Sequence, residues 1–158
     1  MLEIGFGPGE GIAECVKLTP QGFVAGVDQS QTMLDMAQQR NHRAIMEEHV
    51  ELTLGTAASL PYADESFDKL FAVNVFHFWE HPAVELAECR RVLKKGGRVA
   101  FYVTDPASYI PGMDETGIFF PRTEQEIAQL LSSAGFQNVA HREEISTDGK
   151  GFVVFGER

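Results

Sequence analysis

The first eleven residues constrain this chain more than any other stretch. A short apolar run, Met1 to Ile4, breaks into four glycines at alternate positions, Gly5, Gly7, Gly9 and Gly11. Glycine reaches backbone conformations that other residues avoid, and it lets backbone N–H groups and a helix N-terminus approach a ligand closely. The stretch predicts a strand, a ligand-binding turn and the start of a helix.

The glycine spacing argues against a dinucleotide site. The fingerprint G-x-G-x-x-G needs its third glycine at position 10 or 12, where this chain has Glu10 and Ile12. Glu3 and Glu10 would repel a pyrophosphate and attract a cation. A nicotinamide-dependent oxidoreductase is therefore disfavoured. The alternative is a flexible connection with Glu3 at a solvated edge, although four glycines would then lose backbone entropy without a use.

The pattern E-x-G-x-G-x-G resembles the first motif of class I S-adenosylmethionine (SAM) dependent methyltransferases. The resemblance implies that SAM is the cofactor, that the turn passes under its methionyl part, and that Glu3 helps to hold its ammonium group. The cofactor-binding residues implied in this motif are Glu3, Gly5, Phe6, Gly7 and Gly9.

A second acidic position follows the next strand. The short apolar stretch 22–27 ends on Asp28, about 20 residues beyond the glycines, where nucleotide-binding folds place a carboxylate for the ribose hydroxyls. Asp28 and Gln29 are predicted to bind the cofactor. Alternatively Asp28 caps the next helix, although Ser30 is available for that role ahead of a helix from Gln31 to about Ile45.

The adenine side of the site is predicted from two stretches. Residues 55–62 follow an alternating strand that begins at Val50, and they resemble the family's "G-D-A-x-x-L-P-F" adenine loop. Thr56 replaces the family's Asp, so a hydroxyl and the backbone of Ala57 are left to contact adenine; an ordinary proline-containing loop is the alternative. Met33, in a stretch similar to "D-x-S-x-x-M-L", is either an adenine contact or a core residue.

The run 69–76 is the most continuously apolar in the chain, which predicts a central strand of a helix-covered parallel sheet. Ligands bind at the carboxyl ends of such strands, so Asn74 and Phe76 are predicted cofactor contacts. His77 is the candidate catalytic base for a hydroxyl or acidic carbon acceptor. The alternative is a histidine packed among aromatic neighbours, because methyl transfer from a sulfonium mainly requires positioning.

The resemblance runs from Leu2 to about Gly156 and includes "R-V-L-K-K-G-G-R" from Arg91 to Arg98. It is most similar to the branch with quinone-biosynthesis and other small-molecule methyltransferases. Residues 1–158 are expected to form a single α/β domain, Rossmann-like and doubly wound. Its mostly parallel seven-stranded sheet should end in an antiparallel hairpin around 147–150. Residues 105–121 are expected to form a substrate-side lid.

The composition and charge of the chain limit the classes of partner that it is expected to bind. A net charge of −10 without a basic run disfavours nucleic acid. No apolar run approaches the length of a membrane span and no signal-peptide pattern opens the chain. Cys15 and Cys89 lack metal-ligand spacing, so we expect free thiols, no metal and a cytoplasmic location.

Family members carry helices before the first strand, whereas this sequence starts inside it. We therefore expect a pocket that is open on that side or covered by a second copy or another partner. The expected function is SAM-dependent methyl transfer to a small-molecule acceptor by in-line displacement. The alternative is a SAM-binding protein that does not catalyse and has a regulatory or partner role.

Overall fold

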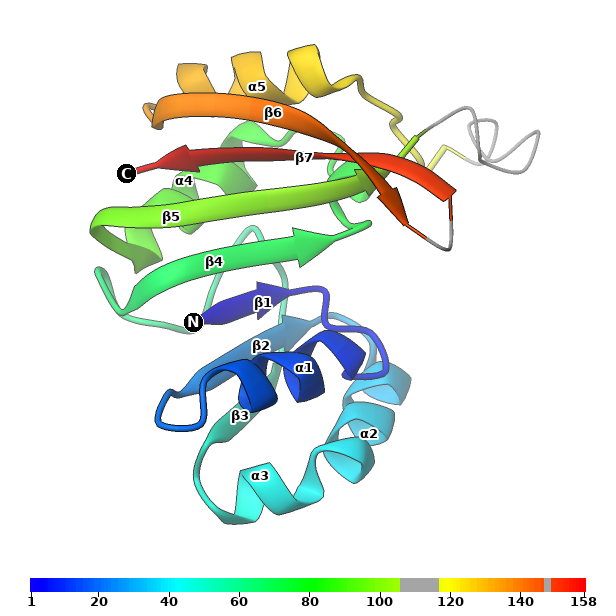
Figure 1. The fold of residues 1–158 in the computed structure, drawn as a ribbon, viewed down its shortest axis with the longest axis vertical. Coiled ribbons are helices and arrows are strands. Elements are labelled where there is room, and N and C mark those ends of the chain that lie inside the picture. Colours follow the sequence, from blue (N-terminus) through cyan, green and yellow to red (C-terminus); the bar gives the residue numbers. More distant parts are fainter. Residues whose placement is uncertain (106–116, 147–148) are drawn as a thin grey trace.

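The structure, a computed structural model, describes residues 1–105, 117–146 and 149–158. Seven strands form one sheet in the order β3-β2-β1-β4-β5-β7-β6 (Figure 1). The strands are β1 Leu2–Ile4, β2 Val24–Asp28, β3 Val50–Leu54, β4 Phe67–Val73, β5 Leu93–Thr104, β6 Gln137–Ser146 and β7 Gly149–Glu157. The helices are α1 Glu10–Leu18, α2 Gln31–Arg40, α3 His42–Met46, α4 Ala83–Val92 and α5 Glu124–Ser133, with a 3-10 turn η1 at Phe76–Phe78.

The strand order confirms the predicted doubly wound sheet. Across the sheet, the neighbouring strands β3, β2, β1, β4 and β5 pair in parallel. Strand β7 pairs antiparallel with both β5 and β6. The chain builds outward from β1 through β2 to β3 and then returns to the other side of β1 with β4. This reversal is a topological switch point, and open α/β sheets bind ligands beside it, at the carboxyl ends of the strands.

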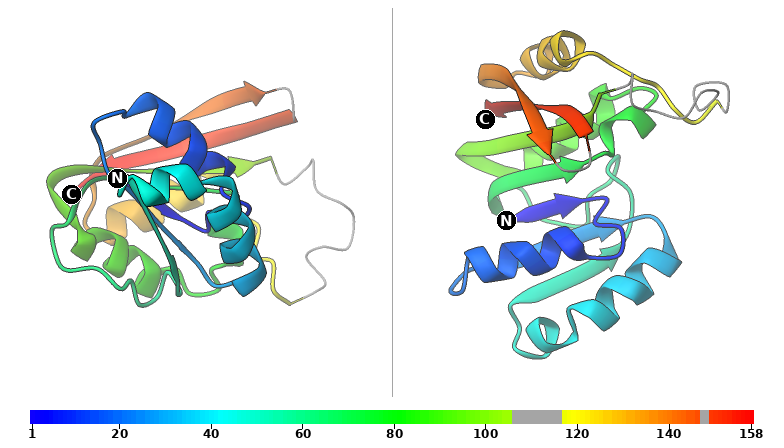
Figure 2. Two further views of the ribbon diagram at one scale, coloured as in Figure 1. Left: turned by 90° about the horizontal axis from the view of Figure 1, so that it is seen from below. Right: turned by 45° about the vertical axis from the view of Figure 1, so that its right-hand side comes forward.

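Helices cover both faces of the sheet. Figure 2 shows α1 on one face, with α4 and α5 on the opposite face. The larger core cluster includes Leu70, Leu86, Phe101 and Ile127, all at most 1% exposed. A smaller cluster beneath α1 and α2 contains Ile12. Together they fix the carboxyl edge of the sheet by burying large apolar side chains, at about 1.5–3 kcal/mol each.

Two predicted elements end earlier than expected. The helix predicted from Gln31 to about Ile45 is divided at Asn41, whose side-chain Nδ2 donates to the carbonyls of Gly9 and Ala37, each at 3.0 Å. The strand predicted for 69–76 stops at Val73, because Asn74 takes a positive φ of 54° and η1 follows.

Strand β5 begins at Leu93, within the R-V-L-K-K-G-G-R motif, and it contains a bulge. Phe67 of β4 pairs with Leu93, whereas Lys69, two residues later, pairs with Arg98. The extra residues on β5 include Gly96, whose φ of +73° suits the bend. The Gly96-Gly97 pair thus marks a bulge within β5.

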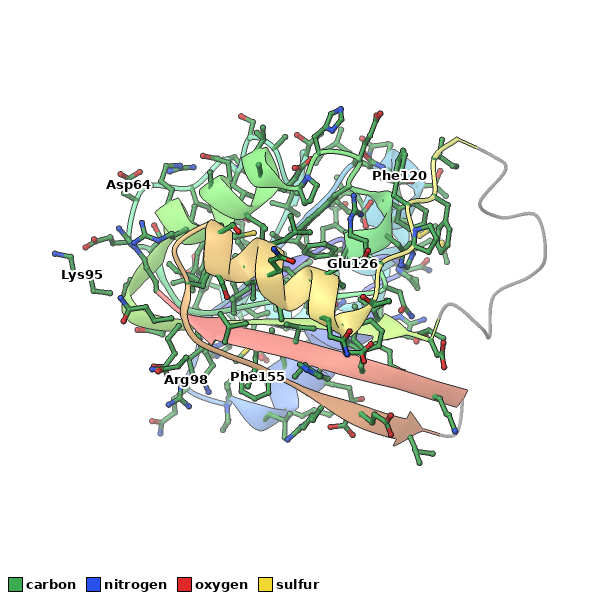
Figure 3. All side chains as sticks on the ribbon, turned by 90° about the horizontal axis from the view of Figure 1, so that it is seen from above. Asp64, Lys95, Arg98, Phe120, Glu126 and Phe155 are labelled. Atoms are coloured by element: carbon green, nitrogen blue, oxygen red, sulfur yellow. The ribbon has the colours of Figure 1, made fainter. Side chains whose placement is uncertain are left out.

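The predicted lid, 105–121, lies mostly outside the described residues, as do Thr147 and Asp148 of the hairpin turn. Within the described part, the Phe120 N–H donates to the His77 carbonyl at 2.7 Å. Figure 3 labels Phe120 at the carboxyl end of the sheet and Lys95 at the opposite end. None of the described helices is both long enough and apolar enough to cross a membrane.

Candidate cofactor-binding site

A cleft of about 350 Å³ opens where the carboxyl ends of β1, β2 and β4 meet. It therefore lies at the switch point that the strand order defines. The described residues that line it are Ile4, Gly5, Val27, Asp28, Gln29, Gly55, Thr56, Ala57, Ala58, Val73, Asn74, Val75, Phe78, Trp79 and Glu85.

The glycine turn after β1 owes its alternate spacing to the backbone. Gly5, Gly7 and Gly9 have φ values of +69°, +51° and +81°. This left-handed region costs other residues about 1–2 kcal/mol each. The Gly5 N–H donates to the Val27 carbonyl at 2.7 Å, which ties the turn to β2. Gly5 lines the cleft, whereas Gly7 and Gly9 shape the turn behind it.

Asp28 lines the cleft and also holds the turn. Its Oδ2 accepts from the Gly7 N–H and its Oδ1 from the Ser30 N–H, both at 2.9 Å. Ser30 caps α2 as predicted, since its Oγ accepts from the Met33 N–H at 3.4 Å. Each carboxylate oxygen of Asp28 keeps further acceptor capacity, so the loop role does not prevent binding of ribose hydroxyls.

Glu3 lies behind the cleft, buried to 3% exposure, and does not line it. Its carboxylate packs against the first turn of α1, where a Cβ on Gly11 would lie 2.3 Å from Oε1. Oε2 is buried and has no hydrogen-bond partner among the described residues. Burial, and then the charge of Asp28, raise the pKa of Glu3 to about 8. A cation bound nearby would favour the ionised form.

The loop after β3 contributes Thr56 and Ala57 to the cleft, and Thr56 forms an isolated bridge with Ser59. A side chain of α4 holds this loop in place. Arg91 donates to the carbonyls of Leu60 at 3.0 Å and Tyr62 at 2.7 Å. Sequence reasoning missed this anchor, although Arg91 opens the "R-V-L-K-K-G-G-R" motif.

Glu88, one turn before Arg91 on α4, completes the anchor. Its Oε2 accepts from the Leu60 N–H at 2.8 Å, and its Oε1 pairs with Arg91 at 2.7 Å. The i, i+3 spacing of these two residues on a helix was the available sequence signal.

At the end of β4, Asn74 lines the cleft while its Oδ1 accepts from the Thr104 N–H at 2.8 Å. Gln29 also lines the cleft.

Three other predicted cofactor contacts do not reach the cleft. Met33 is half-buried on α2, Phe6 is buried in the smaller core cluster, and Phe76 is 1% exposed. The Phe76 ring packs against Trp79 and Phe101, at centroid distances of 5.0 and 5.1 Å.

His77, the candidate base, is 4% exposed and is not among the residues that line the cleft. Its ring lies between those of Phe78 and Phe119, at centroid distances of 4.5 and 4.4 Å. Burial lowers its pKa to about 4, so the ring is neutral near pH 7. This geometry favours the packed histidine over the base. Instead the structure brings Glu85 to the cleft, a residue that sequence reasoning did not single out.

Comparison with known proteins places this chain in a family. The methyltransferase domain family matches residues 2–101. The chain is 30% identical over 148 residues to a malonyl-[acyl-carrier protein] O-methyltransferase of Methylococcus capsulatus, covering 88% of this chain and 52% of that protein. It is 29% identical over 143 residues to a probable phthiotriol/phenolphthiotriol dimycocerosates methyltransferase 2 of Mycobacterium ulcerans, covering 90% and 48%. The chain thus spans about half the length of these relatives.

Solved structures show the same fold. A SAM-dependent methyltransferase from Aquifex aeolicus superposes with a TM-score of 0.80 at 23% identity, covering 98% of this chain and 79% of that one. Because the family match includes the glycine turn, Asp28 and the loop after β3, the chain belongs to the methyltransferase domain family of class I SAM-dependent methyltransferases.

Proposed function

We propose that this protein transfers a methyl group from SAM to a small-molecule acceptor, and that residues 1–158 act as one domain. One observation carries the proposal: the glycine turn, Asp28 and the Thr56-Ala57 loop converge on a single cleft at the switch point of the sheet. Relatives that are named methyltransferases support it.

The residues of the cleft suit the charge of SAM. The buried Glu3 carboxyl, with an unpartnered Oε2, lies beneath the glycine turn and would favour the ammonium group of the methionyl part. Asp28 would accept from the ribose hydroxyls, and Gln29 lies beside it at the exposed rim. Thr56 and Ala57 would contact adenine.

The remaining predicted residues act around this pocket. Asn74 would border the methionyl end, since it follows β4 at the strand's carboxyl end. Phe6, Gly7 and Gly9 would shape the turn without lining the cleft. The positions of Met33 and Phe76 give each a packing role.

SAM, when bound, supplies a methyl group that its sulfonium already activates. The protein then has to hold the acceptor in line with that methyl group and keep water away. The neutral, buried His77 is not required for either task. The backbone of the turn and the fixed Thr56-Ala57 loop provide the positioning.

Calorimetric titration with SAM, S-adenosylhomocysteine and NAD tests the cofactor. We expect the first two to bind and NAD not to. Asp28→Asn should weaken SAM binding at least tenfold, whereas the matched change Asp35→Asn on the exposed face of α2 should not. Equal binding by both variants, or tighter binding of NAD than of SAM, would contradict the proposed site.

Activity is tested separately with labelled SAM and a panel of metabolites. Product formation would support an enzyme, whereas SAM binding without any product across the panel would favour the non-catalytic alternative. Sedimentation velocity with and without SAM measures whether a second copy associates with the chain, which remains a prediction.

A further inference from the structure

Glu85 stands on the wall of the cleft that the proposed cofactor contacts leave free. It lies in the first turn of α4 and lines the cleft together with Phe78 and Trp79. The proposed cofactor contacts come from the glycine turn, the end of β2, the loop after β3 and the end of β4. The wall formed by η1 and α4 is therefore available to a second molecule.

The Glu85 carboxylate has an unsatisfied atom. Its Oε2 is buried and has no hydrogen-bond partner among the described residues. Such an oxygen has lost its water without gaining a protein donor, which is unfavourable in the free protein. Because Glu85 also lines the cleft, a ligand that donates a hydrogen bond to its carboxylate would remove this cost.

Arg122, a positively charged residue that interacts with Glu85 through space, is engaged elsewhere. Its Nη1 donates to the Phe120 carbonyl at 3.0 Å and its Nη2 to the Glu80 carbonyl at 3.1 Å. Its guanidinium also stands 5.8 Å from the centroid of the Phe76 ring. Arg122 attracts Glu85 through space, but no ion pair joins them within the described part of the chain.

The charge of the cleft restricts what can bind beside Glu85. Its described lining contains the carboxylates of Asp28 and Glu85 and no Lys, Arg or His. A phosphate or carboxylate on the acceptor would be repelled by both groups. An amine is attracted by Glu85, and Trp79 and Phe78, which line the same cleft, are aromatic residues of the kind that bind a protonated amine.

We propose that Glu85 binds an N–H group of the methyl acceptor and that the acceptor is a small amine. This assignment rests on the proposed methyltransferase function. The amine reacts in its neutral form: its nitrogen lone pair bonds to the methyl carbon as the carbon–sulfur bond breaks, and that electron pair stays on sulfur, which becomes a neutral thioether. The N-methylammonium product leaves the cleft and releases its extra proton to water.

The test uses two probe sets on the whole chain: benzylamine and 2-phenylethylamine, and their neutral counterparts benzyl alcohol and 2-phenylethanol. Binding to the protein saturated with S-adenosylhomocysteine is measured by calorimetry, and methylation with labelled SAM. We expect the amines to bind at least tenfold more tightly than the alcohols. Failure of every amine to bind, or tighter binding of the alcohols, would overturn the assignment.

Glu85→Gln is the deciding variant, and Glu80→Gln is its control because Glu80 carries the same charge but is exposed and outside the cleft lining. We expect Glu85→Gln to weaken amine binding at least tenfold and to leave SAM affinity within twofold, with Glu80→Gln matching wild type. Unchanged amine binding in Glu85→Gln would refute the role. Weakened SAM binding would assign Glu85 to the cofactor instead. If the wild-type protein did not bind SAM at all, that result would refute the proposed function and not only the role of Glu85.

Discussion

Replacing Gly9 by alanine tests the account of the glycine turn. Gly9 has a φ of +81°, and an added Cβ would lie 2.8 Å from the Ala37 Cβ, 2.9 Å from the Ala37 Cα and 2.6 Å from the Asn41 Nδ2. The left-handed backbone costs about 1–2 kcal/mol, and overpacking against α2 a further ~1–3 kcal/mol. Reduced entropy of the unfolded chain offsets about 0.4–1 kcal/mol. We therefore expect a net loss of roughly 2–4 kcal/mol.

Gly7 and Gly96 provide matched controls. Their φ values are +51° and +73°, and an added Cβ at either position would meet nothing within 4 Å. Only the backbone cost remains, so Gly7→Ala and Gly96→Ala should lose about 1 kcal/mol or less. Urea denaturation followed by circular dichroism measures all three. In thermal melts, Gly9→Ala should lower the Tm by about 4–16 °C and the controls by less than about 4 °C.

The comparison is decisive because the three variants share the same chemical change. If Gly9→Ala were no less stable than Gly7→Ala, the close approach of the turn to α2 would not exist in solution. A large loss in Gly96→Ala alone would instead indicate that the β5 bulge, and not the turn, limits stability.

Three further changes follow from the site. The folded-state pKa of Glu3, about 8, exceeds its ordinary value of 4.5, so the folded protein keeps a proton that the unfolded chain loses between these values. Stability should therefore fall by about 1–4 kcal/mol from pH 5 to pH 8, and Glu3→Gln should flatten that slope in urea titrations. The His77 pKa of about 4 lies below its ordinary 6.5, so stability should fall as the pH drops from 6.5 to 4. His77→Phe should remove this acid sensitivity and keep the methyl-transfer rate within about threefold, whereas a rate loss of about 100-fold would mark a true base. Arg91→Ala should cost about 1–3 kcal/mol, because two loop carbonyls lose their donor, and should weaken SAM binding in calorimetry; unchanged stability would mean that the loop does not need this anchor.

Local chemistry explains what the sequence predicted correctly. Thr123 and Glu126 form a capping box at the start of α5, and this pattern can be read from the sequence because it needs only residues three apart. Ser30 caps α2 for the same reason. The doubly wound sheet followed from alternating strands and helices, whereas the seven strands with a closing antiparallel hairpin followed from the family resemblance.

The side chains around His77 could not be predicted in this way. If the strand had continued through Phe76, as predicted, Phe76 and His77 would both have stayed near its carboxyl end. The positive φ of Asn74 instead ends β4, and η1 turns Phe76 into the core and His77 toward Phe119. A positive φ at a non-glycine residue depends on tertiary hydrogen bonds, here from Asn74 to β5, which the sequence does not display.

Other site features depend on residues that are distant in sequence. Asn41 reaches the Gly9 carbonyl across 32 positions, and Arg91 reaches the Leu60 carbonyl across 31. The two members of each pair do not share a helix or a strand, so no helical or strand periodicity links them. Glu85 belongs to this class too: its place in the cleft depends on how α4 packs beside β4, and its own surroundings in the sequence read as an ordinary helix start.

The cleft concentrates features that reduce the stability of the free protein. Gly5, Gly7 and Gly9 of the turn and Asn74 at the end of β4 adopt left-handed conformations, Glu3 is buried with its pKa raised to about 8, and Oε2 of Glu85 has no donor among the described residues. A loop that served only to connect β1 to α1 would gain nothing from these costs. A cationic cofactor would favour ionised Glu3, and a second molecule that donates a hydrogen bond to Glu85 would offset the other carboxylate cost. The buried carboxylates that lower the stability of the free protein are therefore the same groups that would favour a positively charged ligand.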